Sequence, residues 1–190
     1  MHAQKKIRAR ITDITLGAMF GALLFASQVA LAGLPNIEVI SLFIIVWTRV
    51  FRTGALPGIA VFVALQGLMY GFGIWWVSYL YIWFILWGLV MLIPHRPSRG
   101  DGGGRLRRWL LPSLGWAVLS GAYGFSFGAL TAIPWLIRGG PGTALAYWLS
   151  GIPFDVAHCI GNFAAALILA VPLMELLGKL RSLLWREKPL

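Results

Sequence analysis

Residues 53–95 read TGALPGIAVFVALQGLMYGFGIWWVSYLYIWFILWGLVMLIPH, a run of 43 residues without Asp, Glu, Lys or Arg. A helix that crosses a membrane needs about 20 apolar residues, so this run is too long for one crossing and suits two. The sequence YGFGIWW (70–76) offers the turn between them, because it combines two glycines with a tryptophan pair typical of a membrane interface. The run therefore predicts a helical hairpin in a membrane.

The rest of the chain has the same character. Further uncharged runs cover 14–37, 109–137, 139–154 and 156–174. The whole sequence is 59% hydrophobic and only 12% charged, which leaves too little polar surface for a soluble domain. We expect one all-α integral membrane domain over 1–190. The single cysteine excludes an intrachain disulfide and a multi-cysteine metal site.

Six transmembrane helices are predicted, each following an apolar run. They span about 12–32, 36–51, 55–71, 75–93, 109–131 and 152–178. The second is short, so either it begins below the membrane surface or Glu38 faces protein. Ser150 or Gly151 is expected to cap the last helix, with Pro153 in its first turn.

Basic residues decide the orientation. Six crossings place both termini on one side, together with 15 of the 16 Lys and Arg residues, and leave Arg138 alone on the other. Basic loops mark the cytoplasmic face, so both termini and the loop 94–108 are expected in the cytoplasm. The net charge of +10 then reflects topology and not nucleic-acid binding. In the alternative, a signal peptide ending at Ala30-Leu31-Ala32 would be removed and leave five crossings.

The opposite, outer face combines three charged residues, Glu38, Arg138 and Asp155, with aromatic and amide side chains. Such a mixture describes either an interfacial aromatic belt or a small-molecule site. The further candidate binding residues are Asn36, Trp75, Trp76, Tyr79, Tyr81, Trp135 and Tyr147.

The last predicted helix carries a polar stripe. His158 and Asn162 lie three and seven residues after Asp155, so the three side chains share one helix face. An unpaired acid inside a membrane is costly, about 2.5–3.5 kcal/mol at the helix centre, so the stripe must face protein or water. It is either a polar zipper between helices or the wall of a pocket open to the outside. Cys159 is the residue after His158, beside this stripe on the helix, and we expect it to be a small packing residue of the core.

Small residues also recur on the first helix. Ala18, Ala22 and Ala26 are spaced by four, a pattern that lets another helix approach closely. The pattern suits either internal packing or the docking of a partner membrane protein.

These features resemble one known family, the substrate-binding S-components of energy-coupling factor (ECF) vitamin transporters. The resemblance is carried by the alanine pattern of the first helix and by LPNIEVISLFII (34–45), GFGIWWVSYLYIW (71–83) and GIPFDVAHCIGNF (151–163), and it spans nearly the whole chain. It implies a six-helix bundle with a vitamin pocket near the outer surface of a prokaryotic cell membrane. It also implies that the first helix docks on a transmembrane coupling subunit and that the subunit topples during transport.

The same resemblance implies that energy comes from two cytosolic ATPases, since this chain carries no ATP-binding motif. No cofactor or metal is expected to bind to this chain itself. The branch is similar to proposed cobalamin S-components, where His158 or Cys159 could approach cobalt. Thiamin-type vitamins would suit the acids and tryptophans equally well.

Two other function classes stay open. An intramembrane enzyme could use Asp155 to orient His158 as a general base, although the sequence has no HExxH motif and nothing in it ties Ser120 or Ser126 to His158 as a nucleophile. A solitary transporter or channel would work without ATPases.

Overall fold

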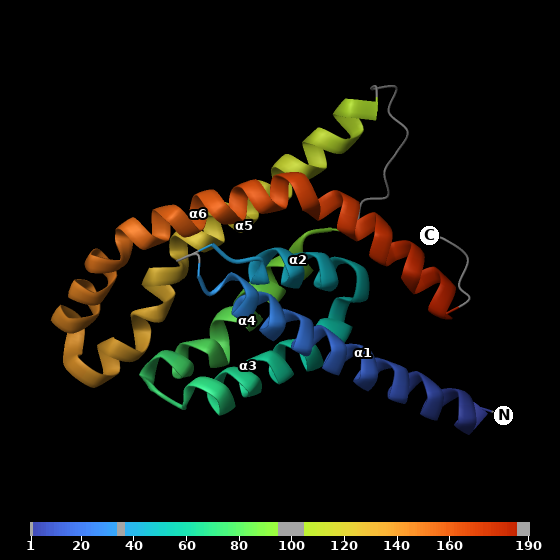
Figure 1. Ribbon diagram of the computed structural model, residues 1–190, viewed down its shortest axis with the longest axis horizontal. Helices are drawn as coiled ribbons and strands as arrows, with labels where there is room; N and C mark the ends of the chain where they lie inside the picture. Colours follow the sequence, from blue (N-terminus) through green and yellow to red (C-terminus); the bar gives the residue numbers. More distant parts are fainter. Residues whose placement is uncertain (1, 34–36, 95–104, 186–190) are drawn as a thin grey trace.

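The computed structural model describes residues 2–33, 37–94 and 105–185, and all regular secondary structure in these ranges is helical. The all-α class is confirmed. The elements are α1 (His2–Leu31), α2 (Ile40–Phe51), the 3-10 helix η1 (Arg52–Ala55), α3 (Leu56–Tyr70), α4 (Ile74–Leu92), α5 (Arg105–Thr131) and α6 (Ile133–Trp185) (Figure 1).

Four stretches of the described residues are long and apolar enough to cross a membrane: 11–31, 40–70, 74–92 and 133–183. By length and composition, this is a multi-pass membrane protein. The prediction of six transmembrane helices is not shown. Two of the six are missing from this set. One is the crossing expected over 109–131, because α5 is not among the four candidate stretches. The other is α2, whose 12 residues span only about 18 Å at 1.5 Å per residue, against a hydrocarbon core of about 30 Å. Through η1 it forms one apolar stretch with α3.

The last helix differs most from its prediction. α6 begins at Ile133 and not near residue 152, and Ser150 does not cap it, because its hydroxyl donates to the Tyr147 carbonyl inside the helix. The break lies at Gly140, whose φ of 78° is accessible to glycine, and Pro141 occupies the first turn after it. Pro141 therefore starts the long segment of α6, and Pro153 lies within the helix.

The remaining boundaries differ less. The hairpin of 53–95 is present as α3 and α4, and α3 ends at Gly71 with a φ of 86°. Of the predicted loop 94–108, residues 95–104 lie outside the described ranges and 105–108 already belong to α5.

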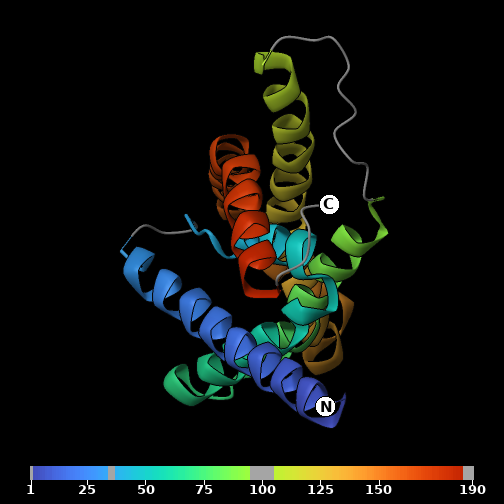
Figure 2. The same cartoon turned by 90° about the vertical axis from the view of Figure 1, so that its right-hand side faces the viewer.

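The helices pack around α2, which lies near the centre of the molecule (Figures 1 and 2). Eight of its 12 residues are buried, and they include Ser41 and Thr48 as well as apolar side chains. α1 crosses α3 closely, because a Cβ at Gly21 would lie 2.6 Å from Val61. α5 and α6 run side by side over most of α5.

One end of the bundle is held together by side chains that bind helix-terminal carbonyl groups. Arg49 donates to the carbonyls of Ile93 and Pro94, both at 2.9 Å, and Arg181 donates to Val50 at 2.7 Å. The N-terminal end of α1 and the C-terminal end of α6 also lie toward this end (Figure 1). The cavity described below lies away from these contacts.

Candidate functional site

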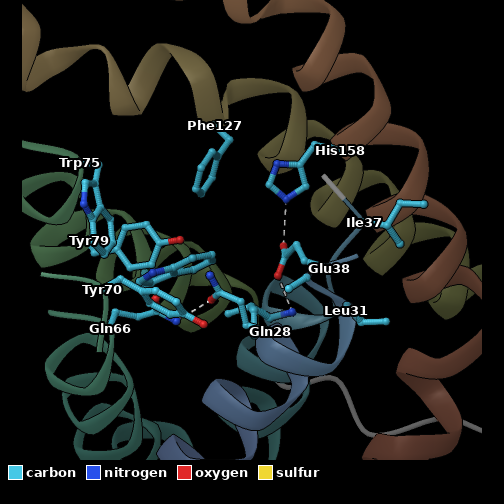
Figure 3. A pocket seen from close by; sticks show the side chains of 13 residues that line it. Gln28, Leu31, Ile37, Glu38, Gln66, Tyr70, Trp75, Tyr79, Phe127 and His158 are labelled. Atoms are coloured by element: carbon cyan, nitrogen blue, oxygen red, sulfur yellow. Dashed lines mark hydrogen bonds and ion pairs between the residues drawn. The ribbon is translucent and has the colours of Figure 1, made fainter. Parts of the chain in front are cut away.

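A cavity of about 460 Å³ lies between the C-terminal part of α1, the entry to α2, and α3, α4, α5 and α6 (Figure 3). Its volume falls within the range of about 300–1,000 Å³ that is usual for small-molecule sites. The lining residues are Gln28, Leu31, Ala32, Ile37, Glu38, Ile40, Gln66, Tyr70, Trp75, Tyr79, Trp83, Phe127 and His158.

Glu38 forms the acidic side of the cavity and also caps α2. One carboxylate oxygen accepts from the backbone N–H groups of Ile40 and Ser41, the orphan donors at the start of the helix. The other oxygen accepts from the Ser41 hydroxyl at 2.7 Å and from His158 Nε2 at 3.0 Å. The carboxylate therefore joins the entry of α2 to α6, two segments far apart in sequence.

Burial by itself raises the pKa of the Glu38 carboxyl, but this effect is outweighed. Hydrogen bonding to His158 and its charge, with further hydrogen bonds from Ser41 and the Ile40 amide, bring the pKa below the usual value. Glu38 is thus a carboxylate at neutral pH, and an ionised carboxylate only accepts hydrogen bonds. It follows that His158 Nε2 carries a proton and donates it.

Amide groups form the second polar side of the cavity. Gln66 is buried to 1% exposure and its Nε2 donates to Gln28 Oε1 at 2.7 Å, and Tyr79 lines the cavity together with both glutamines. Neither glutamine was among the predicted site residues. Gln66 had a signal in the sequence, since it is the only amide side chain in the uncharged run 53–95.

Aromatic rings connect the two polar sides. Trp75, Tyr79 and Trp83 are spaced by four on α4, so they share one face of the helix. Their rings meet edge to face, with centroids 5.3 and 5.5 Å apart. Phe127 continues the wall to His158, at a centroid distance of 4.9 Å. In Figure 3 this arc runs from Trp75 to His158.

Other predicted aromatic residues lie elsewhere. Trp76 donates to the Val63 carbonyl and packs on Phe72, and the Tyr81 hydroxyl donates to Leu130, so both brace the helices. Neither lines the cavity.

The polar stripe of α6 divides among three environments. His158 lines the cavity. Asp155 faces α5, where its Oδ1 accepts from the Gly128 amide at 2.9 Å. Asn162 donates to the Ser41 hydroxyl at 3.2 Å, which places it behind Glu38. The stripe is therefore a polar zipper at Asp155 and Asn162, and only its central member faces the cavity.

The predicted residues near the kink of α6 form a separate group. Trp135 stacks on Tyr147 with a centroid distance of 5.3 Å, and the Arg138 guanidinium lies 5.8 Å from the Trp135 ring centroid. None of the three lines the cavity. Asn36 lies outside the described residues.

The small residues of α1 face two ways. Gly17 and Gly21 are buried against α3, whereas Ala18, Ala22 and Ala26 are exposed. Internal packing is therefore done by the glycines, and the alanine stripe is available at the surface of this chain.

Among the described residues, no group of three or more His, Cys, Asp and Glu side chains could hold a metal ion. Cys159 is half-buried against Gly121 of α5 and does not line the cavity. The cavity is thus suited to holding an organic ligand between aromatic rings and two polar sides. Comparisons of the chain with protein-family models, curated proteins and solved structures found no match.

Proposed function

We propose that this protein captures a vitamin at the outer face of a prokaryotic cell membrane and delivers it as the substrate-binding S-component of an ECF-type importer. The observation that carries the proposal is the cavity of about 460 Å³, which is lined by aromatic and polar side chains from all six α-helical segments or their ends. Apolar walls with a few convergent polar groups are the usual form of a small-molecule site.

The orientation is part of the proposal. Both termini are placed in the cytoplasm, on the side of the basic residues, and the cavity opens toward the outer face. α2 runs from Glu38 at the cavity to Arg49 at the opposite end of the bundle, and the other helices surround it. In this arrangement it counts as one short pass through the membrane. This gives an even number of passes although α2 is too short to span alone.

The exposed alanine stripe of α1 is the proposed docking surface for a transmembrane coupling subunit, which would connect the chain to two cytosolic ATPases. Small residues at this spacing allow close helix contact. Replacing Ala18 and Ala22 by Leu should abolish co-purification with the coupling subunit and spare ligand binding. Ala60 and Ala64 of α3, also exposed and four apart, provide the matched control pair.

The cavity volume favours a vitamin of drug-like size or smaller. Cobalamin, a much larger corrinoid, would have to extend through the opening. Thiamin-sized ligands would be enclosed.

The binding test uses protein purified in detergent. A panel of B vitamins, cobalamin included, is titrated by calorimetry without nucleotide, and small molecules that co-purify are identified by mass spectrometry. We expect one vitamin to bind with nanomolar to micromolar affinity. No signal from any vitamin, together with no co-purifying ligand, would refute the proposal.

The geometry does not favour an intramembrane enzyme. Asp155 Oδ1 accepts from Gly128, and Oδ2 has no hydrogen-bond partner among the described residues, so this carboxyl does not orient His158. The α1 docking experiment distinguishes the proposal from a solitary transporter, because a solitary transporter would not bind a coupling subunit.

A further inference from the structure

The cavity has an unusual set of fixed charges. Among the described residues, its lining contains one carboxylate, Glu38, one imidazole, His158, and no lysine or arginine. A second acid, Asp155, lies three residues before His158 on the same face of α6. With Glu38 ionised, no protonation state of these three groups makes their net charge positive.

The helix N-terminus at the acidic side of the cavity, that of α2, is already occupied. The N-terminus of a helix attracts anions because its first N–H groups and its dipole point toward them. At α2 those groups, from Ile40 and Ser41, bind Glu38 of the same chain. The Ser41 hydroxyl and His158 Nε2 bind it as well, so four donors meet a carboxylate with about four acceptor sites.

The remaining surfaces suit neutral or positive groups. The Gln28–Gln66 pair and the Tyr79 hydroxyl carry no charge and can both donate and accept hydrogen bonds. The faces of Trp75 and Trp83 attract cations and stack on flat rings. Among the described lining residues, His158 is the one group that can carry a positive charge, and its Nε2 already binds Glu38. A buried carboxylate or phosphate would therefore remain unpaired, and burying an unpaired charge is costly.

We infer that this cavity accepts a neutral or cationic ligand with a planar unsaturated part, and that it excludes ligands whose buried portion carries a carboxylate or phosphate. The inference rests on the proposed function, which makes this cavity the ligand site.

The test compares two thiol reagents of opposite charge at one cysteine. Ile37 lines the cavity and is 46% exposed, so Ile37→Cys should fold; Cys159→Ala removes the only native thiol. Reaction rates are measured for the trimethylammonium and the sulfonate forms of ethyl methanethiosulfonate. Ser150→Cys, exposed on α6, serves as the control site in the same background.

The ratio of cationic to anionic rates at Ile37→Cys should exceed the control ratio by about tenfold or more. Adding Ala32→Lys, which places a positive charge on the lining, should move the ratio toward the control. A ratio at Ile37→Cys equal to or below that of the control would overturn the inference, as would a ratio unaffected by Ala32→Lys.

The two proposals fail separately. A preference for the cationic reagent without binding of any vitamin would remove the proposed function but leave the charge selectivity. Binding of a vitamin through a buried carboxylate or phosphate would retain the function and remove the selectivity.

Discussion

Replacing Glu38 by Ala should destabilise the protein more than any other single change of an acid. The carboxylate caps α2 and accepts from His158 and Ser41 in a site where its side chain is 14% exposed. Loss of a helix cap costs about 1 kcal/mol. Leaving the two side-chain donors without their charged acceptor costs about 1–2 kcal/mol each. The expected loss is therefore about 3–5 kcal/mol.

The assay is thermal unfolding of the purified protein, followed by the fluorescence of its 10 tryptophans. For a chain of this size, 1 kcal/mol corresponds to about 2–4 °C, so Tm should fall by about 10 °C. The control is Glu175→Ala, because Glu175 is an exposed acid on α6 and should change Tm by no more than about 2 °C. If Glu38→Ala were as stable as Glu175→Ala, the capping and bridging role assigned to Glu38 would be wrong.

Three further outcomes are expected. Since the pKa of Glu38 is lowered in the folded protein, its stabilisation is complete above the unfolded pKa of about 4.5. It should be lost as pH falls through the lower folded value, so the Tm gap between wild type and Glu38→Ala should narrow below pH 4.5 in pH-dependent melts. Gly128→Ala should lower Tm by several degrees, because the new Cβ would lie 2.1 Å from Asp155 Oδ2; Gly115→Ala on the same helix meets nothing within 4 Å and should be neutral or stabilising by calorimetry. Trp75→Ala should weaken binding of the vitamin found by titration about tenfold or more, and equal weakening by Trp135→Ala, which lies outside the cavity lining, would contradict the site.

The predicted site was partly right in its residue types and incomplete in its membership. Glu38, Trp75, Tyr79 and His158 line the cavity, while Gln28 and Gln66 were missed. Helical spacing correctly put Asp155 and His158 on one face of α6. Spacing alone could not show which neighbour each meets, because α5 covers Asp155 and the entry of α2 covers His158.

The error at the start of α6 has a similar origin. Pro153 and Pro141 both suit the first turn of a helix, so local pattern does not choose between them. In the structure the break falls at Gly140, whose positive φ separates the two helical segments, and Pro141 follows it directly. Burial does not set this start, because nine of the ten residues 141–150 are exposed.

The amino-acid sequence by itself determined the membrane class and the helical secondary structure. These properties depend on apolar length and on charge along the chain, and each short segment contributes to them independently. Only the tertiary structure decided the cavity. It pairs Glu38 with His158 across 120 positions and Gln66 with Gln28 across 38. Such pairings arise because buried polar groups must find hydrogen-bond partners wherever packing brings them together.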